Sequence, residues 1–384
     1  MGPGSLSRTT LSQRRVAVLG GLRSSGFTLL ELMIGAAVGM LTTLIIANVL
    51  LLAEAQPRAV TSGADAQVNG ALSLYAIQRD VQMAGYGVIS SPTGLGCEIR
   101  AQRGGVNFIW LLAPVLIADG AAGAPDSITV LSSSADRYAA PLRIVADHPS
   151  TAASFFVSTT MGVAEGDLML AVPPSIDANN WCSVFNITGL GNNGGQGQTQ
   201  NQFHHDSGNN GPWNQSGGQT IFPAAGYPAG SYLLNLGQLI NRTYSISAGG
   251  GLQLASLNTS SATTETREIF PGIVNLQAYY GLDTDADGVI DSYTTTTPTT
   301  NGGWRQLVTV RIAVVARSTQ LEKEDVTHVD PLWDVGAAVP VAGSATCGSS
   351  QCVTLKVSHL ADWKRYRYKI HDVVVPVRNM LWHS

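Results

Sequence analysis

The chain has 384 residues, enough for one large domain or two smaller ones. Its net charge of −4 excludes attraction to nucleic acid or to an anionic membrane by bulk charge alone. Charged residues make up only 12 %, against roughly 25 % in typical soluble domains, and Gly, Ser, Thr, Asn and Gln take their place. This composition is common in exported, β-rich proteins.

The first predicted element is an apolar helix near the N-terminus. Residues 1–26 contain four arginines and no acid, and residues 32–53 are apolar except for two threonines and Asn48. At about 1.5 Å per residue, residues 32–53 extend roughly 33 Å, enough to cross a bilayer core of about 30 Å. Arginines before the span place the N-terminus in the cytoplasm and the bulk of the protein outside it. An ordinary secretory signal peptide fits poorly, because its apolar region is only about 7–15 residues long.

Glu31 is the single charge between residues 27 and 53. An ionised carboxylate in hydrocarbon costs a few kcal/mol or more, so it usually has a partner or a function. One interpretation places Glu31 at headgroup level. Another has the chain cut after Gly26, so that the new amine of Phe27 on a neighbouring subunit neutralises Glu31.

The stretch GFTLLELMI closely resembles the class III signal of type IV pilins and type II secretion pseudopilins. In those proteins a short basic leader ends in Gly, and an aromatic residue and a Glu occupy the first and fifth positions after it. The resemblance implies that prepilin peptidase removes a leader of residues 1–26 by cutting after Gly26, and that Phe27 is N-methylated. It also implies that the helix at 27–53 leaves the inner membrane and packs into a filament core.

The helix is expected to continue as an amphipathic extension over residues 54–86, with a kink or an interruption at Pro57. Apolar residues return there at helical spacing, and Gly85-Tyr86-Gly87 predicts the stop. The end of this segment, RDVQMAGYG, resembles the helix end of PilW-type minor pilins. The apolar positions are Val68, Ala71, Leu72 and Tyr75, then Leu74, Ile77, Val81 and Ala84.

Residues 87–384 are predicted to form a β-rich head, so the fold class is α+β with antiparallel sheets. Residues 189–219, rich in Gly, Asn and Gln, predict a flexible loop or a boundary between two β-rich lobes. His204 and His205 fall inside this segment, and we expect them to be solvated and to share no metal. Turn-bounded stretches rich in β-branched residues are SITVL (127–131), DLMLAV (167–172), YLLNLGQLI (232–240), RTYSIS (242–247), LVTVRIAVVA (307–316), CVTLKV (352–357) and IHDVVVPV (370–377).

The segment DTDADGVID, residues 283–291, indicates a calcium loop, because acidic side chains at alternate positions can converge on one ion. Gly288 permits the sharp turn, and Thr294 replaces the glutamate that would complete an EF-hand. The alternative is an acidic turn without an ion. The expected ligands are Asp283, Asp285, Asp287, the carbonyl of Val289, and Asp291.

The four cysteines all follow the apolar span, which indicates disulfides in an oxidising compartment. Cys347 and Cys352 are close enough for a small loop disulfide, which would leave Cys97 with Cys182. Three pairings are possible in principle.

Three further segments resemble the PilW family: FPGIVNLQAYYGLDTDADG (270–288), LVTVRIAVVARS (307–318) and VVVPVRNM (373–380). The resemblance implies a minor pilin that helps prime type IV pilus assembly, and hence twitching motility, or sits near the pilus tip. It implies a single-pass protein of the inner membrane with a periplasmic head, later part of a cell-surface pilus. The implied partners are prepilin peptidase, the inner-membrane assembly platform, other minor pilins, the major pilin and a tip adhesin.

Two other functions stay open: a type II secretion pseudopilin resembling the J component, and an adhesive or nucleic-acid-binding pilus module. The second would use the Gly/Asn/Gln segment or KRYRYKIHD (364–372), where basic and aromatic residues alternate. We expect KRYRYKIHD to be a strand with one solvated and one buried face, and nucleic acid not to be a partner. Because the sequence shows no nucleophile–base arrangement and no phosphate-binding glycine loop, we expect no enzymatic activity.

Overall fold

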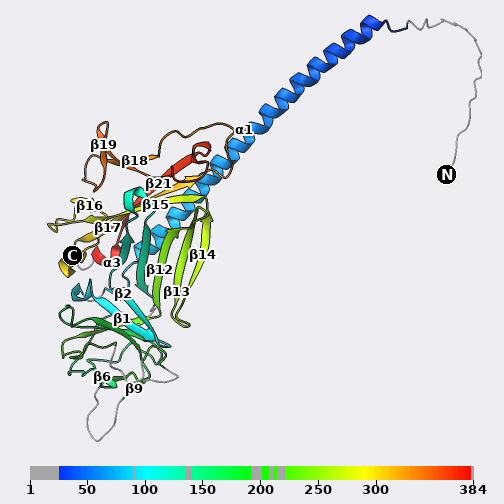
Figure 1. Cartoon of the computed structure of the whole chain (residues 1–384). Coiled ribbons are helices and arrows are strands. Elements are labelled where there is room, and N and C mark those ends of the chain that lie inside the picture. Colours follow the sequence, from blue (N-terminus) through cyan, green and yellow to red (C-terminus); the bar gives the residue numbers. More distant parts are fainter. Residues whose placement is uncertain are drawn as a thin grey trace, which may run out of the picture. The chain divides into compact units, whose positions relative to one another are not determined.

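The computed structural model describes residues 26–89, 92–134, 140–191, 201–206, 211–214 and 221–381. The chain forms two compact units, Met1–Pro57 and Arg58–Ser384. Helix α1 (Leu29–Met83) is followed by several β-sheets, whose named strands pair antiparallel except for β1 with β8 (Figure 1). The predicted class, α+β with a long apolar N-terminal helix and antiparallel sheets, is confirmed.

Helix α1 runs through Pro57 as one element, so the interruption expected there is wrong. A proline inside a helix removes one N–H from the ladder, and the remaining hydrogen bonds suffice to carry the helix past it. The predicted stop is confirmed, because α1 ends at Met83, and Gly85 and Gly87 follow with φ of 80° and 71°. In that left-handed region glycine carries no steric cost.

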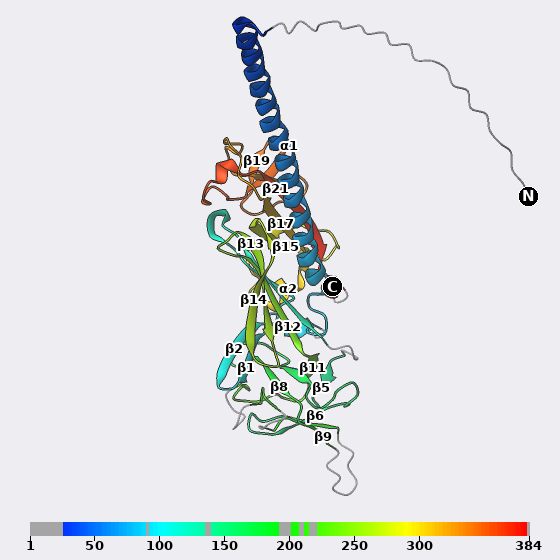
Figure 2. The same cartoon turned by 90° about the vertical axis from the view of Figure 1, so that its right-hand side faces the viewer.

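The second unit consists of two lobes (Figure 2). The main core extends through both lobes, because Ile77 of α1 and Leu170 and Val184 of the second lobe all belong to it, whereas a further core lies wholly within the second lobe. The helix lobe consists of α1 from Arg58 onward and three sheets. These sheets have the strand orders β14-β13-β12-β4-β3, β16-β15-β17-β21 and β18-β20-β19. Their strands are β3 (Val115–Ala118), β4 (Ser127–Ser133), β12 (Leu239–Ile246), β13 (Gly251–Asn258), β14 (Thr263–Pro271), β15 (Ile273–Leu282), β16 (Ser292–Thr294), β17 (Leu307–Arg317), β18 (Leu332–Gly336), β19 (Ala345–Cys347), β20 (Ser350–Thr354) and β21 (Tyr368–Pro376).

The second lobe consists of the sheets β2-β1-β8-β7-β11-β5 and β6-β10-β9. It draws on two stretches of chain, residues 98–111 and 142–237, on either side of β3 and β4. Its strands are β1 (Glu98–Arg103), β2 (Val106–Leu111), β5 (Leu142–Arg143), β6 (Ser154–Phe156), β7 (Leu168–Val172), β8 (Cys182–Asn186), β9 (Gly189–Gly191), β10 (Gln202–His204) and β11 (Tyr232–Gly237). Short helices are η1 (Pro92–Gly94), η2 (Ala121–Gly123), α2 (Asn301–Arg305), η3 (Trp363–Arg365) and α3 (Arg378–Leu381).

One face of α1 is buried in the helix lobe. The predicted stripe of Leu74, Ile77, Val81 and Ala84 lies in the main core, at the helical spacing that puts these residues on one side. Gly70 continues this face, and a Cβ at Gly70 would overlap the imidazole of His371 on β21. The absence of a side chain therefore lets the sheet approach the helix.

Polar contacts fix the register of α1 on the sheets. The Asp80 carboxylate accepts hydrogen bonds from Arg242 Nη1 at 3.0 Å and from Tyr244 Oη at 2.7 Å, both on β12. Beyond the helix end, the Asn379 side chain donates to the carbonyl of Ala84 at 2.9 Å. The end of α1 is thus held by residues from the middle and the far end of the chain.

Candidate functional site

The start of α1 is a capping box formed by Thr28 and Glu31. The Thr28 backbone N–H and hydroxyl donate to Glu31 Oε2 at 3.2 and 3.1 Å, and the Glu31 N–H donates to Thr28 Oγ1 at 3.2 Å. This reciprocal arrangement satisfies donors that have no partner inside the helix. Gly26 and Phe27 precede it outside any helix or strand, and both are exposed. The predicted leader otherwise lies outside the described residues.

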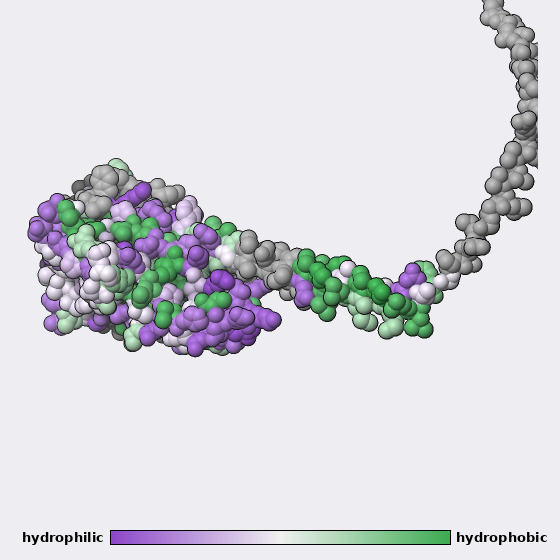
Figure 3. Space-filling view, turned by 90° about the horizontal axis from the view of Figure 1, so that it is seen from above, coloured by the Kyte–Doolittle hydropathy of each residue, from purple (hydrophilic) through white to green (hydrophobic). Residues whose placement is uncertain are grey.

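The apolar span Leu29–Leu50 is long enough to cross a membrane, and none of its side chains is buried (Figure 3). The hydroxyls of Thr42 and Thr43 donate to backbone carbonyls one turn back, at 2.9 to 3.0 Å. These two hydroxyls are thereby satisfied within the helix, as an apolar surrounding demands. An apolar surface of this length is compatible with a single-pass membrane anchor and with packing against other helices.

In the second unit, α1 carries a second apolar stripe on its outer side. Val68, Leu72 and Tyr75 are 55 %, 47 % and 63 % exposed. The sequence predicted one apolar face here, and the head covers only the part of the predicted positions that contains Leu74. The stripe of Val68, Leu72 and Tyr75 remains available to another protein.

The acidic loop follows β15 and brings three of the predicted carboxylates together. Oxygens of Asp283, Asp285 and Asp287 lie within 4.8 Å of one another. Asp283 is buried and accepts from the N–H groups of Ala286 and Gly288 at 2.7 and 2.8 Å, which holds the loop in a curl. Hard cations such as Ca²⁺ bind several oxygens of this kind, so the residues present fit half of a calcium shell.

The electrostatics of the loop distinguish its members. The neighbouring charge of Asp287 is the main reason that the pKa of Asp285 lies above its usual range. Hydrogen bonds from Thr284 hold the pKa of Asp291 below its usual range, and Asp291 is not among the three clustered carboxylates. Asp291 therefore closes the loop by accepting two hydrogen bonds at Oδ2, from the Thr284 backbone nitrogen at 2.7 Å and from Thr284 Oγ1 at 2.6 Å. Val289 donates its N–H to Asp287 Oδ1 at 2.7 Å.

The cysteine pairing follows the spacing argument. Cys97 is bonded to Cys182, which ties the residue before β1 to the first residue of β8, and Cys347 is bonded to Cys352 across β19 and β20. Both predicted pairs are confirmed.

The described part of the predicted loop at 189–219 is not solvated throughout. It contains β9, β10 and the buried Trp213, and the remainder lies outside the described residues. His204 is partly exposed, but His205 is buried, so the solvated interpretation is wrong for His205. Its Nε2 lies 2.9 Å from Nε2 of His148, among phenylalanines.

The segment KRYRYKIHD is a strand only from Tyr368 onward, because Trp363–Arg365 forms the turn η3. Arg367 Nε lies 2.7 Å from a Glu322 oxygen, and Arg365 Nε donates to the Glu322 carbonyl. These basic groups are bound within the protein, which does not favour a nucleic-acid surface.

Residues 243–379 match the family described as type IV pilus-assembly protein W. No curated protein and no solved structure matches the chain. The pilus-assembly match begins in β12 and ends in α3, so it includes the acidic loop, the Cys347–Cys352 hairpin and the strand that covers α1. It supports a role in type IV pilus assembly. Helix α1 and the second lobe lie outside the matched residues.

Proposed function

We propose that this protein is a minor pilin of the PilW type, which helps prime type IV pilus assembly or sits near the pilus tip. The observation that carries this proposal is the exposed apolar helix whose capping box begins two residues after Gly26. It occurs in a chain whose residues 243–379 match a pilus-assembly family. Prepilin peptidase would cut after Gly26, and Phe27 would be methylated on its new amine.

Glu31 would exchange partners during assembly. In the free chain its carboxylate binds Thr28. Beside a neighbouring subunit it would pair with the α-amine of that subunit's Phe27, where low dielectric strengthens the attraction. The apolar surface of Leu29–Leu50 would pass from lipid to the helices of other minor pilins and the major pilin.

The proposed protein is held in the inner membrane by α1 with its head in the periplasm, and later lies in a pilus at the cell surface. The assembly platform and a tip adhesin complete its expected partners. It is proposed to have no enzymatic activity. Its acidic loop is proposed to bind Ca²⁺ through Asp283, Asp285 and Asp287, which would fix the connection between β15 and β17.

N-terminal sequencing of the mature protein tests this function directly. The sequence should begin FTLLELM, with a methylated first residue detected by mass spectrometry. A mature protein that begins at any other residue contradicts the pilin proposal. A strain without prepilin peptidase provides the control, because the full leader should remain on the protein there.

A further inference from the structure

Strand β2 is an edge strand of the six-stranded sheet, paired with β1 on one side and, among the described residues, with no strand on the other. Its sequence, VNFIWL, contains five apolar residues, no charge and no proline. Its register with β1 runs without a shift from Arg103–Val106 to Glu98–Leu111. Val106 and Ile109 are 57 % and 66 % exposed. A regular, uncharged, apolar edge presents unpaired backbone groups that another strand can use.

The other sheet edges in the described part of the chain are protected. Strands β14, β18 and β21 carry charged side chains, and β14 and β18 also have register shifts. The remaining edge strands have at most four residues. The longest of these, β3, has its Ile117 N–H occupied by Tyr280 Oη at 2.7 Å. Charge, bulges and shortness are the usual protections against edge pairing, and β2 has none of them.

The hairpin geometry identifies which backbone groups of β2 are free. Gly104 and Gly105 form a two-residue turn with positive φ at both positions, so Arg103 and Val106 exchange hydrogen bonds. Because pairing alternates along an antiparallel ladder, Phe108 and Trp110 also face β1. Asn107 and Ile109 therefore direct their N–H and C=O groups toward the free edge.

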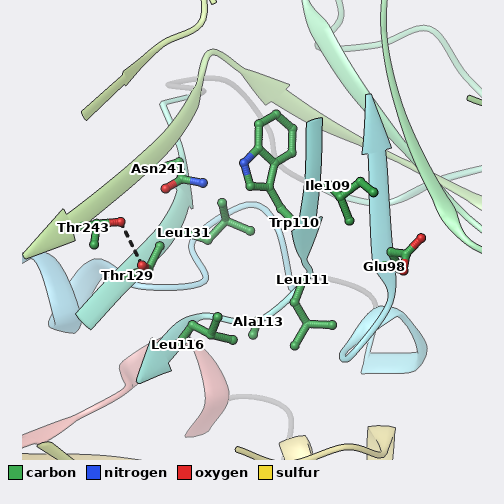
Figure 4. Close-up of a pocket in the computed structure, with 10 residues that line it drawn as sticks. All are labelled: Glu98, Ile109, Trp110, Leu111, Ala113, Leu116, Thr129, Leu131, Asn241 and Thr243. Atoms are coloured by element: carbon green, nitrogen blue, oxygen red, sulfur yellow. Dashed lines mark hydrogen bonds between the residues drawn. The ribbon is translucent and has the colours of Figure 1, made fainter. Parts of the chain in front are cut away.

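A groove of about 490 Å³ lies beside the C-terminal half of β2, at Ile109, Trp110 and Leu111. In Figure 4, β2 separates β1 from the groove, and β4 and β12 form the opposite wall. Trp110, Leu116 and Leu131 supply the apolar lining. The polar side is formed by Asn241 and by Thr129 and Thr243, whose hydroxyls lie 2.8 Å apart. A second copy that pairs through β2 would bring its whole sheet against this wall, whereas a single extended segment needs only the space between β2 and the wall.

We propose that this groove binds an extended segment of another protein, which adds as a strand to β2. The backbone of that segment would pair with Asn107 and Ile109. Since side chains alternate along a strand, every second one would enter the apolar lining, and the others would face Thr243 and Asn241 or solvent. The groove includes one charged side chain, Glu98, which is already paired with Arg100 at 2.6 Å. The expected segment is therefore uncharged, with apolar residues at alternate positions.

Binding of defined peptides to the full-length chain in lipid nanodiscs tests this proposal. The probes are six-residue peptides in which Thr alternates with Val, Ile, Leu or Phe. Each has two partners that are N-methylated at alternate amides, one for each face of the strand. We expect at least one parent peptide to bind, and methylation on one face alone to weaken it by at least thirtyfold. In the bound protein, amide exchange of Asn107 and Ile109 should slow at least tenfold, while Phe108 and Trp110 stay unchanged.

Two substitutions at Ile109 separate the backbone from the side chain. Ile109→Pro removes the free N–H without touching the ladder to β1, as proline permits on an edge, and should abolish binding. Ile109→Ala keeps that N–H and should weaken binding by less than tenfold.

Three results would overturn the proposal: no binding by any parent peptide, equal binding by both methylated partners, or protection of neither edge amide. A fourth is a dimer of the chain that excludes the peptides and that Ile109→Pro dissociates, because this would assign the edge to a second copy. If Ile109→Pro does not fold, the comparison of parent and N-methylated peptides on the unaltered chain still tests the proposal.

Discussion

Glu31 caps the start of α1 in the free chain. Under the proposed function, its carboxylate pairs with the α-amine of a neighbouring subunit in the filament. Two substitutions separate these roles. Glu31→Gln retains a side-chain oxygen for Thr28, so the capping box survives while the charge is lost. Glu31→Ala removes both. We expect both variants to insert and be cleaved normally, and both to lose co-purification with the other minor pilins and to reduce surface pili.

Counting pili by electron microscopy and measuring co-purification checks this expectation. If Glu31→Gln behaves like the unaltered protein and only Glu31→Ala is defective, the carboxylate acts through the cap, and the proposed ion pair is wrong.

Gly70 and Gly63 both lie inside α1, where glycine usually costs about 1 kcal/mol relative to alanine. A Cβ at Gly63 meets nothing within 4 Å, whereas one at Gly70 would overlap the His371 ring and reach Ala316 Cβ at 3.1 Å. Gly63→Ala should therefore stabilise the protein by about 0.5–1 kcal/mol. Gly70→Ala should destabilise it by about 1–3 kcal/mol, because it overpacks the contact between helix and sheet.

Denaturant unfolding of the two glycine variants, followed by tryptophan fluorescence, measures this difference. Equal stabilities for Gly63→Ala and Gly70→Ala would show that the sheet moves away from the helix at little cost. Local sequence does not indicate which glycine is required, since His371, which needs the space, is 301 positions after Gly70.

At the scale of single elements, the acidic loop is expected to bind calcium. Binding to the folded state alone would stabilise the protein by about 2.7 kcal/mol when calcium is at a hundredfold excess over its Kd. Asp285→Asn with Asp287→Asn should remove this gain. Asn preserves the side-chain oxygens that accept from Asp287 and Val289, so the loop should keep its shape.

Thermal unfolding with calcium and with chelator provides the measurement. Glu324→Gln with Asp325→Asn is the matched control, because it removes the same charge from exposed acids outside the loop. A melting temperature that calcium does not change, in protein shown to be free of metal at the start, leaves the loop as an acidic turn.

Local patterns predicted the elements well. The 3.6-residue periodicity identified the buried face of α1, β-branched runs located β4, β7, β17 and β21, and short spacing identified the Cys347–Cys352 pair. Sequence placed Val68, Leu72 and Tyr75 on the same apolar face as Leu74, and it could not show that the head leaves them exposed, because that depends on strands distant in the chain. It also missed the packing of His205 and Trp213, since their Gly/Asn-rich surroundings carry no periodicity. The sequence also could not show that β2 lies at the edge of its sheet, because strand order depends on all the strands of the sheet.

At the scale of the whole molecule, the two lobes are expected to respond oppositely to acid. Burial lowers the pKa of both His148 and His205 in the second lobe, so this lobe favours the neutral pair. The unfolded chain then binds more protons below about pH 6.5, and the contribution of the pair to stability is lost as the pH falls from there. In the helix lobe, burial raises the pKa of Asp126 to about 7, so its contribution increases as the pH falls through that value.

Amide exchange at pH 7.5 and pH 5.0, corrected for the intrinsic pH effect, resolves the two lobes. The second lobe should lose protection at pH 5.0 before the helix lobe does. His148→Phe with His205→Phe replaces both hydrogen-bonding partners by apolar rings and should remove the sensitivity of the second lobe. Equal protection of that lobe at both pH values in the unaltered protein contradicts the expectation.

The hydrogen bond from Asn379 to Ala84 joins residues 295 positions apart. His371 of β21, which meets α1 at Gly70, lies 301 positions after that glycine. A ribosome adding about 5–20 residues per second needs roughly 15–60 s to reach them after completing the helix. During that time no strand covers Leu74, Ile77 and Val81, and these side chains form an exposed hydrophobic surface that a chaperone can bind. The helix is thus among the first parts to be made, and its fit in the head is among the last to be settled.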